Sequence, residues 1–221
     1  MKKIIIILSL GLCMFGINCN KNNVNKEKED FASNYKYLDD VNHVFEKINY
    51  DEIISLINKD GKAIIYFGGS WCPNCQAVVS FINDIAKKMH IDTIYNFDTK
   101  IDFDGEVRDI RRCKNTDDTD MWSKIINKIG YTSDKYVEID GVKVKDSLGN
   151  FIPSMSVPTI VVINDGVIMS YVAREYFYNP DSLTLWDTKT FDGEDVTESF
   201  KTELVSLFTI YDGCTDDECS A

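Results

Sequence analysis

Proline and histidine are scarce in this chain of 221 residues, which contains only 4 prolines and 2 histidines. The low proline content, together with 44% hydrophobic and 27% charged residues, excludes a collagen-like or wholly disordered protein. His43 and His90 have no second histidine or carboxylate at ligand spacing, so we expect both at the surface rather than in a metal site. The length allows one generous domain or two small ones.

Positive charge is also in short supply. The chain has 24 Lys and Arg residues against 36 Asp and Glu residues, and its formal net charge is -12 at pH 7. Sequence-independent binding to the phosphate backbone of a nucleic acid requires clustered cations. We therefore expect no nucleic-acid partner.

The N-terminal apolar run is too short for a transmembrane helix, which needs about 20 residues. This run, residues 4–17, follows Lys2 and Lys3 and is typical of a signal peptide. Residues 15–19 (FGINC) resemble a loose lipobox, the motif at which bacterial lipoproteins are cleaved and lipidated on a cysteine. Cys19 would then be the lipidated first residue, although Asn18 departs from the small residue usual before that cysteine.

The remaining chain divides by composition. After a signal peptide over residues 1–18, residues 19–35 are mostly polar and predict a flexible tether. A folded domain spans residues 36–211, and residues 212–221 form an acidic tail. We expect a monomer held at the outer side of a membrane by a lipid anchor, or a secreted or periplasmic protein if Cys19 is not lipidated.

Strand and helix patterns alternate in the folded part. Local signals include a capping box at Asn49 and Glu52 and a type I′ turn at Asp140 and Gly141. We expect strands at 44–48, 63–67, 91–97, 137–139, 142–144, 157–163 and 167–172, and helices at 50–58, from the cysteine motif to about 90, at 121–129 and from 195. Residues 99–120 are polar and predict irregular structure.

Cys72 and Cys75 form a C-x-x-C motif between a buried strand and a helix. The helix N-terminus would stabilise a thiolate on Cys72, and a thiolate attacks disulfides. Cys75, nearly one turn later, could attack the resulting mixed disulfide. Pro73 suits a first helical position, where its missing N–H costs nothing. The alternatives are half of a metal site or a structural disulfide.

The residues around this motif resemble the thioredoxin superfamily. The similarity lies in residues 63–75, which end in WCPNC, and in residues 156–166, which contain SVPT and an Asn-Asp-Gly turn. It implies an α/β thioredoxin-like fold, a central mixed β-sheet flanked by helices, with catalytic Cys72 and Cys75. It also implies that Trp71 borders the pair, that Pro158 is cis and faces the cysteines, and that the Val157 backbone pairs with substrate.

Two features depart from the thioredoxin pattern. Where thioredoxin has a buried aspartate upstream of the first cysteine, this chain has Tyr66. Residues 99–155 are interpreted as an insertion between the active-site β-α-β unit and the cis-proline strand. With the signal peptide and tether, the closest type is the membrane-anchored extracytoplasmic thiol-disulfide oxidoreductases.

The other cysteines have weaker signals. Cys214 and Cys219 predict a small structural disulfide, with a second shuttle pair as the alternative. Cys113 is then an odd thiol, whose thiolate Arg111 and Arg112 would favour if it were exposed. Glycine-containing acidic segments at 102–105 and 191–193 lack the ligand order of a calcium loop and are interpreted as solvated turns.

Two hypotheses about function follow. The first is an oxidoreductase that exchanges thiols and disulfides with protein substrates and a redox partner, with no metal or organic cofactor. The second is a non-catalytic accessory module, associated with a transporter or binding a metal through the same cysteines.

Overall fold

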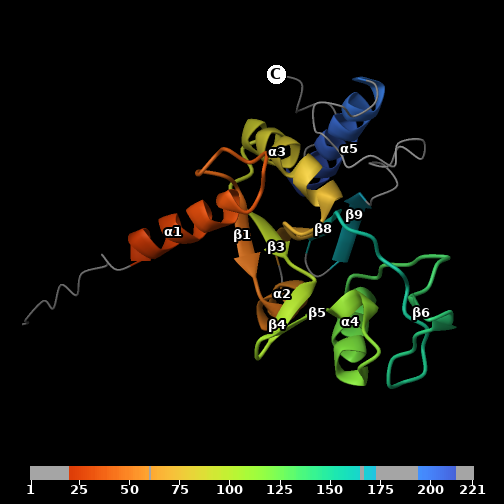
Figure 1. Ribbon diagram of the computed structural model, residues 1–221. Helices are drawn as coiled ribbons and strands as arrows, with labels where there is room; N and C mark the ends of the chain where they lie inside the picture. The colour runs from red at the N-terminus through yellow and green to blue at the C-terminus, as the bar shows by residue number, and fades with distance from the viewer. Residues whose placement is uncertain (1–19, 60, 165–166, 173–193, 213–221) are drawn as a thin grey trace, which may run out of the picture.

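The structure is a computed structural model that describes residues 20–59, 61–164, 167–172 and 194–212 (Figure 1). Its elements in chain order are α1 (Asn20–Ser33), β1 (Phe45–Ile48), α2 (Tyr50–Asn58), β2 (Lys62–Phe67), α3 (Pro73–Lys88), β3 (Ile94–Phe97), β4 (Lys100–Phe103), β5 (Glu106–Asp109), the 3-10 helix η1 (Ile110–Arg112), α4 (Thr116–Lys128), β6 (Glu138–Ile139), β7 (Val142–Lys143), β8 (Thr159–Asn164), β9 (Val167–Val172) and α5 (Glu194–Asp212).

Five strands form a central sheet in the order β1-β3-β2-β8-β9. β1 and β2 run parallel to β3, whereas β8 is antiparallel to β2 and β9 is antiparallel to β8. β2 occupies the middle, and its residues 63–67 are all buried. A continuous apolar run suits a strand covered on both faces.

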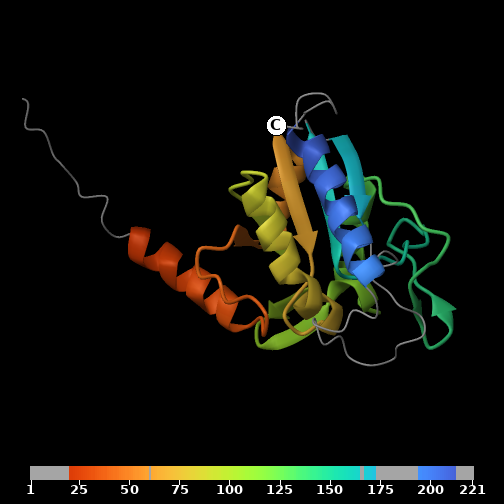
Figure 2. The same cartoon turned by 90° about the horizontal axis from the view of Figure 1, so that it is seen from above.

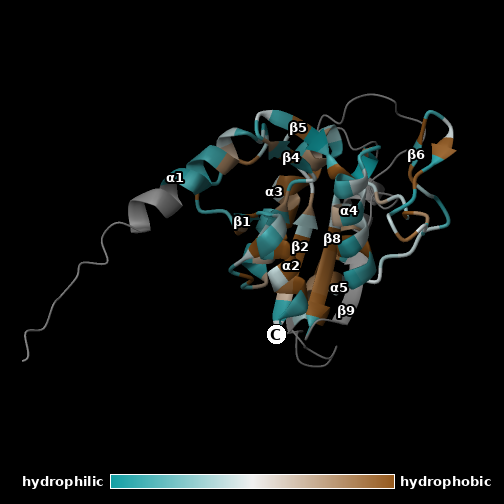
Figure 3. Cartoon of the chain, turned by 90° about the horizontal axis from the view of Figure 1, so that it is seen from below, coloured by the Kyte–Doolittle hydropathy of each residue, from teal (hydrophilic) through white to brown (hydrophobic). Residues whose placement is uncertain are grey.

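Helices cover both faces of this sheet. α3 and α5 lie side by side over one face, and α2 and α4 lie over the other (Figures 1 and 2). The central strands β2 and β8 are mostly hydrophobic, and the helices around them carry many hydrophilic residues (Figure 3). This architecture confirms the predicted α/β class, a central mixed β-sheet flanked by helices.

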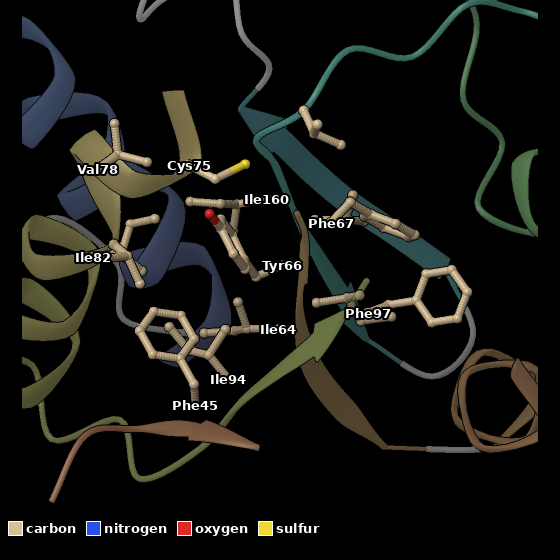
Figure 4. Close-up of a cluster of buried hydrophobic side chains, with 14 of the residues drawn as sticks. Phe45, Ile64, Tyr66, Phe67, Cys75, Val78, Ile82, Ile94, Phe97 and Ile160 are labelled. Atoms are coloured by element: carbon tan, nitrogen blue, oxygen red, sulfur yellow. The ribbon is translucent and has the colours of Figure 1, made fainter. Parts of the chain in front are cut away.

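Adjacent residues of β2 point into different halves of the core. The Phe67 ring meets Trp122 of α4 edge-on, with centroids 6.0 Å apart, so Phe67 faces the α2 and α4 layer. Tyr66 faces the α3 layer, where Figure 4 shows it between Cys75 and Phe45. Alternation along a strand thereby places Tyr66 under the cysteine motif.

Local sequence signals predicted several element ends correctly. The capping box of α2 is present, since Asn49 Oδ1 accepts from the Glu52 N–H at 3.0 Å and Glu52 Oε2 accepts from the Asn49 N–H at 2.7 Å. Asp140 and Gly141 have φ of 53° and 76° between β6 and β7, as a type I′ turn requires. The helix from 195 is α5, and among its described side chains Phe200, Leu204, Leu207 and Phe208 are buried.

The prediction of irregular structure at 99–120 is wrong. β4 and β5 form an antiparallel hairpin there, and α4 begins at Thr116. The segment 102–105 is the turn of this hairpin, with positive φ at Asp104 and Gly105. An ion pair joins the hairpin to α4, because Arg108 of β5 bonds both carboxylate oxygens of the buried Asp118, at 2.7 and 3.1 Å.

The prediction of a flexible tether over residues 19–35 is wrong for residues 20–33, which form α1. The helix docks by its C-terminal end, where Phe31 and Tyr35 are buried. Lys28 Nζ also donates to the His43 carbonyl at 2.8 Å. The polar composition of residues 19–35 gives no indication of these long-range contacts.

The surface position expected for His43 is also wrong, since this side chain is fully buried. Its ring lies 4.8 Å from that of Phe31 and 5.9 Å from that of Phe45, centroid to centroid. Nδ1 accepts from the Phe45 N–H at 3.1 Å, and Nε2 lies 3.0 Å from the Lys28 carbonyl oxygen. His43 is therefore a neutral core residue with both ring nitrogens satisfied.

Candidate redox-active site

Cys72 and Cys75 lie at the N-terminus of α3, directly after the end of β2. Cys72 is the N-cap residue and Pro73 occupies the first turn, as predicted. The Cys72 sulfur accepts a hydrogen bond from the Cys75 N–H at 3.4 Å. Both thiols are free; Cys72 is 6% exposed and Cys75 is fully buried. Only Cys72 therefore reaches the surface.

The loop before β8 brings a distant segment to this cysteine. The Val157–Pro158 peptide bond is cis, as the resemblance implies. The Cys72 thiol lies 3.6 Å from the Val157 carbonyl oxygen, to which it donates. Cys72, Cys75, Val157 and Pro158 are thereby assembled in one place, although they come from two separate segments.

The two thiols have opposite pKa shifts. The hydrogen bond from Cys75 lowers the pKa of Cys72 to about 7, helped by the N–H groups of Cys75 and Asn74 and by the charge of Arg111, against the opposing effect of burial. Burial raises the pKa of Cys75 well above its usual range, and the neighbouring Cys72 raises it further. Near pH 7 about half of Cys72 is therefore a thiolate, whereas Cys75 remains a thiol.

Trp71 is held beside the cysteines by one carboxylate and two cations. Its Nε1–H donates to Asp98 Oδ1 at 2.8 Å. Lys100 Nζ lies 4.3 Å from the indole ring centroid, and the Arg111 guanidinium carbon lies 5.4 Å from it. The half-buried indole is thus fixed along one edge and covered by two cations.

Arg111 links the hairpin region to the cis-proline loop. Its guanidinium forms two hydrogen bonds to the Asp109 carboxylate, at 3.0 and 2.7 Å, and a third to the Met155 carbonyl oxygen at 3.2 Å. The side chain is 5% exposed. The hydrogen bond to Met155 joins the hairpin region to the segment that leads into the cis proline, and the contact of Arg111 with Trp71 connects this region to the site.

Two glycines let the backbone pass close to these side chains. A Cβ at Gly68 would lie 2.8 Å from the Cys75 sulfur, which is too close for any real contact. A Cβ at Gly69 would collide with the Trp71 indole nitrogen and the Asp98 carboxylate. The Gly68-Gly69 pair before the motif therefore makes room for both groups.

Cys113 does not have the environment that its neighbouring arginines suggested. The half-buried thiol donates to the Asp109 carbonyl at 2.9 Å. Burial and the nearby Asp118 raise the pKa of Cys113 to about 11, and the Arg111 guanidinium is directed to Asp109 and Met155 instead. Cys113 is therefore a poor nucleophile at neutral pH.

Several predicted residues lie outside the described part of the chain: Cys19, Cys214, Cys219 and the segment 191–193. In the described ranges, no three His, Cys, Asp or Glu side chains are grouped to hold a metal ion. Across these same ranges, no helix has the length and apolar character to cross a bilayer.

Sequence reasoning missed Asp98 and Arg111 as parts of the site around Cys72. Asp98 had a usable signal, because it directly follows β3 at the edge where the parallel strands β2 and β3 both end. Arg111 had none, since it reaches the site from a segment that the sequence assigned to irregular structure.

No protein-family model matches the chain, and no curated protein matches it. Solved structures that are similar to it include thioredoxin O2 from Arabidopsis thaliana in the oxidized state, at 16% identity, 75% coverage of this chain, 96% of that chain and a TM-score of 0.36. Oxidized mitochondrial thioredoxin 3 from Saccharomyces cerevisiae has 16% identity, 58% and 81% coverage and a TM-score of 0.30.

A third similar structure comes from work on the thiol resolving mechanism of yeast mitochondrial 1-Cys peroxiredoxin via glutathione and thioredoxin systems. It has 14% identity, covers 58% of this chain and 82% of its own, and has a TM-score of 0.32.

Proposed function

We propose that the protein is an extracytoplasmic thiol-disulfide oxidoreductase that acts on protein disulfides or dithiols through Cys72 and Cys75. The observation that carries this proposal is the asymmetry of the pair. Cys72 reaches the surface with its pKa lowered to about 7, whereas Cys75 is buried with its pKa raised. An attacking thiol works best when its pKa is near ambient pH.

The chemistry in the reducing direction has two steps. The Cys72 thiolate attacks one sulfur of a partner disulfide, forms a mixed disulfide and releases the partner's other sulfur as a thiolate, which takes up a proton. Cys75 then loses its proton and attacks the Cys72 sulfur. The internal disulfide forms, the second partner sulfur leaves and is protonated, and two electrons have passed to the partner. The oxidising direction is the reverse.

The neighbouring groups suit a protein substrate. The Val157 carbonyl beside the Cys72 sulfur is a backbone acceptor for an extended partner segment. Trp71 provides a partly exposed aromatic surface next to it, held by Asp98. These contacts would align a substrate disulfide with Cys72 without requiring a particular substrate sequence.

The location is part of the same proposal and rests on the apolar run 4–17 and the FGINC motif. We propose that Cys19 carries a lipid and holds the domain at the outer face of the membrane. Expression of the chain and of its Cys19→Ser variant in bacteria grown with radiolabelled palmitate tests this. The chain should take up the label and the variant should not, and a chain that takes up no label would contradict a lipid anchor on Cys19.

The activity is tested by trapping. The Cys75→Ser variant should accumulate a mixed disulfide with a disulfide-containing peptide, because its second step is blocked, whereas the unmodified chain should release the reduced peptide. Cys72→Ser should form no adduct at this site. Cys113→Ser is the matched control, because its thiol has its pKa raised to about 11 and should not affect the reaction. If Cys75→Ser turns over normally, the non-catalytic accessory module replaces this proposal.

A further inference from the structure

Two buried tyrosine hydroxyls lie near Cys75 without a hydrogen-bond partner. Tyr66 of β2 is fully buried and Tyr35 is 4% exposed. Within the described ranges, only four buried side-chain polar atoms lack a partner, and these hydroxyls are two of them. A buried hydroxyl without a partner costs free energy. An unsatisfied polar group in a core calls for a specific explanation.

The Tyr66 hydroxyl is directed at the resolving thiol. Figure 4 shows its oxygen at the end of the ring that points toward the Cys75 sulfur. A Cβ at Gly68 would lie 2.8 Å from that sulfur and 2.9 Å from the Tyr66 hydroxyl oxygen. Both atoms therefore line the same small space, and glycine keeps that space open.

The protonation of these groups decides which of them donates. Burial raises the pKa of Tyr66 well above its ordinary value, and the charge of Cys75 raises it further. The phenol therefore keeps its proton, and it can donate to a sulfur anion. On Cys75, burial and Cys72 raise the pKa, and Tyr66 lowers it.

We propose that Tyr66 is a catalytic hydrogen-bond donor that stabilises the Cys75 thiolate while it attacks the mixed disulfide at Cys72. This inference rests on the proposed function. In the thiol state the Tyr66 hydroxyl is unpartnered, and in the thiolate state it gains a charge-assisted hydrogen bond in a fully buried site. The Tyr66 hydroxyl thus has a hydrogen-bond acceptor only when the reacting anion forms.

The resolution step balances without a change in Tyr66. The S–H bond of Cys75 breaks, the Cys75–Cys72 disulfide bond forms, and the bond from Cys72 to the partner sulfur breaks. The departing partner sulfur carries away the electron pair and takes up the proton. Tyr66 keeps its own proton throughout and supplies only the hydrogen bond.

A two-phase reaction of the reduced full chain with dithiobis(nitrobenzoate) tests the inference. The first equivalent of thionitrobenzoate reports attack by Cys72, and the second reports resolution by Cys75. Here the Cys75 proton goes to the buffer, because thionitrobenzoate stays ionised. Cys75→Ser identifies the second phase, since it abolishes that phase at this site.

Tyr66→Phe should leave the first phase unchanged and slow the second about three- to tenfold near pH 7. A lost hydrogen bond to a charged group raises a pKa by about one to two units. A more basic thiolate is also a stronger nucleophile, and this offsets about half of the slowing that the higher pKa causes. The pH at which the second phase reaches its plateau should rise in the same variant.

Tyr35→Phe is the matched control, because it removes another buried, unpartnered hydroxyl near the site. Its second phase should change less than that of Tyr66→Phe. Equal second-phase rates and pH profiles in Tyr66→Phe and the unmodified chain would overturn the inference while leaving the proposed function intact. Loss of the second phase in the unmodified chain would instead overturn the proposed function.

Discussion

The indole Nε1–H of Trp71 donates a hydrogen bond of 2.8 Å to the carboxylate of Asp98, across the ends of two adjacent strands of the sheet. Asp98 is buried enough for its pKa to be raised, mainly by desolvation, and the Trp71 hydrogen bond opposes that rise. Gly69 lets both groups approach. The residue before the cysteine motif is thus oriented by a side chain that follows β3.

Two substitutions of Asp98 distinguish the contribution of its hydrogen bond to stability from the contribution of its charge. Asp98→Asn keeps an oxygen acceptor for the indole and removes a desolvated charge, so its free energy of unfolding should stay within about 0.5 kcal/mol of the original. Asp98→Ala leaves the indole N–H without its partner and should cost about 1–2 kcal/mol. Denaturant unfolding measures both, and Trp71 fluorescence should change more in Asp98→Ala. An equal loss of stability in the two variants would contradict this view of the contact.

Cys72 should titrate near neutrality in the folded protein. Its rate of alkylation, followed by mass spectrometry of the Cys72 peptide, should rise with pH around a midpoint of about 7. Cys75 should remain unreactive over the same range, because its thiol is fully buried and its pKa is raised.

Two substitutions distinguish the two causes of the lowered Cys72 pKa. The Cys75 thiol is the largest cause and Arg111 a smaller one, so Cys75→Ala should raise the midpoint of Cys72 more than Arg111→Met does. A larger shift in Arg111→Met would show that the cation, rather than the neighbouring thiol, stabilises the Cys72 thiolate.

His43 should make stability depend on pH. Burial lowers the pKa of this imidazole from 6.5 in the folded state. A base with a depressed folded-state pKa contributes stability that is fully present above the unfolded value, here about 6.5, and that is lost as pH falls through the folded value. The free energy of unfolding should therefore be smaller at about pH 5.5 than at about pH 7.5.

The size of the His43 effect is bounded at about 1.4 kcal/mol per pH unit. His43→Gln should remove this part of the pH dependence in denaturant titrations. His90→Asn is the control, because His90 is exposed and asparagine tolerates its positive φ of 57°. A pH dependence that persists in His43→Gln and disappears in His90→Asn would contradict the assignment.

The parts of the site that lie on one continuous segment could be predicted from sequence. Residues 63–75 carry a strand, a glycine pair and a helix start, so the positions of Cys72 and Pro73 follow from local patterns. The resemblance in residues 156–166 supplied the cis proline next to them. In both cases the relevant information lies within a few neighbouring residues.

The rest depends on contacts between distant segments. Tyr35 and His43 are buried because α1 docks on the domain, and their polar surroundings in sequence gave the opposite indication. Arg111 reaches Met155 only because the β4–β5 hairpin folds back toward the cis-proline loop. Ion pairs such as that of Arg108 with Asp118 have no periodic signature, so α4 was predicted too short.

We expect Cys72 and Cys75 to form a reversible redox pair. Equilibration of the full chain against glutathione and dithiothreitol buffers, with alkylation and mass spectrometry of the Cys72 and Cys75 peptides, measures whether they do. We expect a single two-electron transition. The modest lowering of the Cys72 pKa predicts a potential nearer the reducing value of thioredoxin, about −270 mV, than about −120 mV. A pair that never interconverts between dithiol and disulfide would contradict the account.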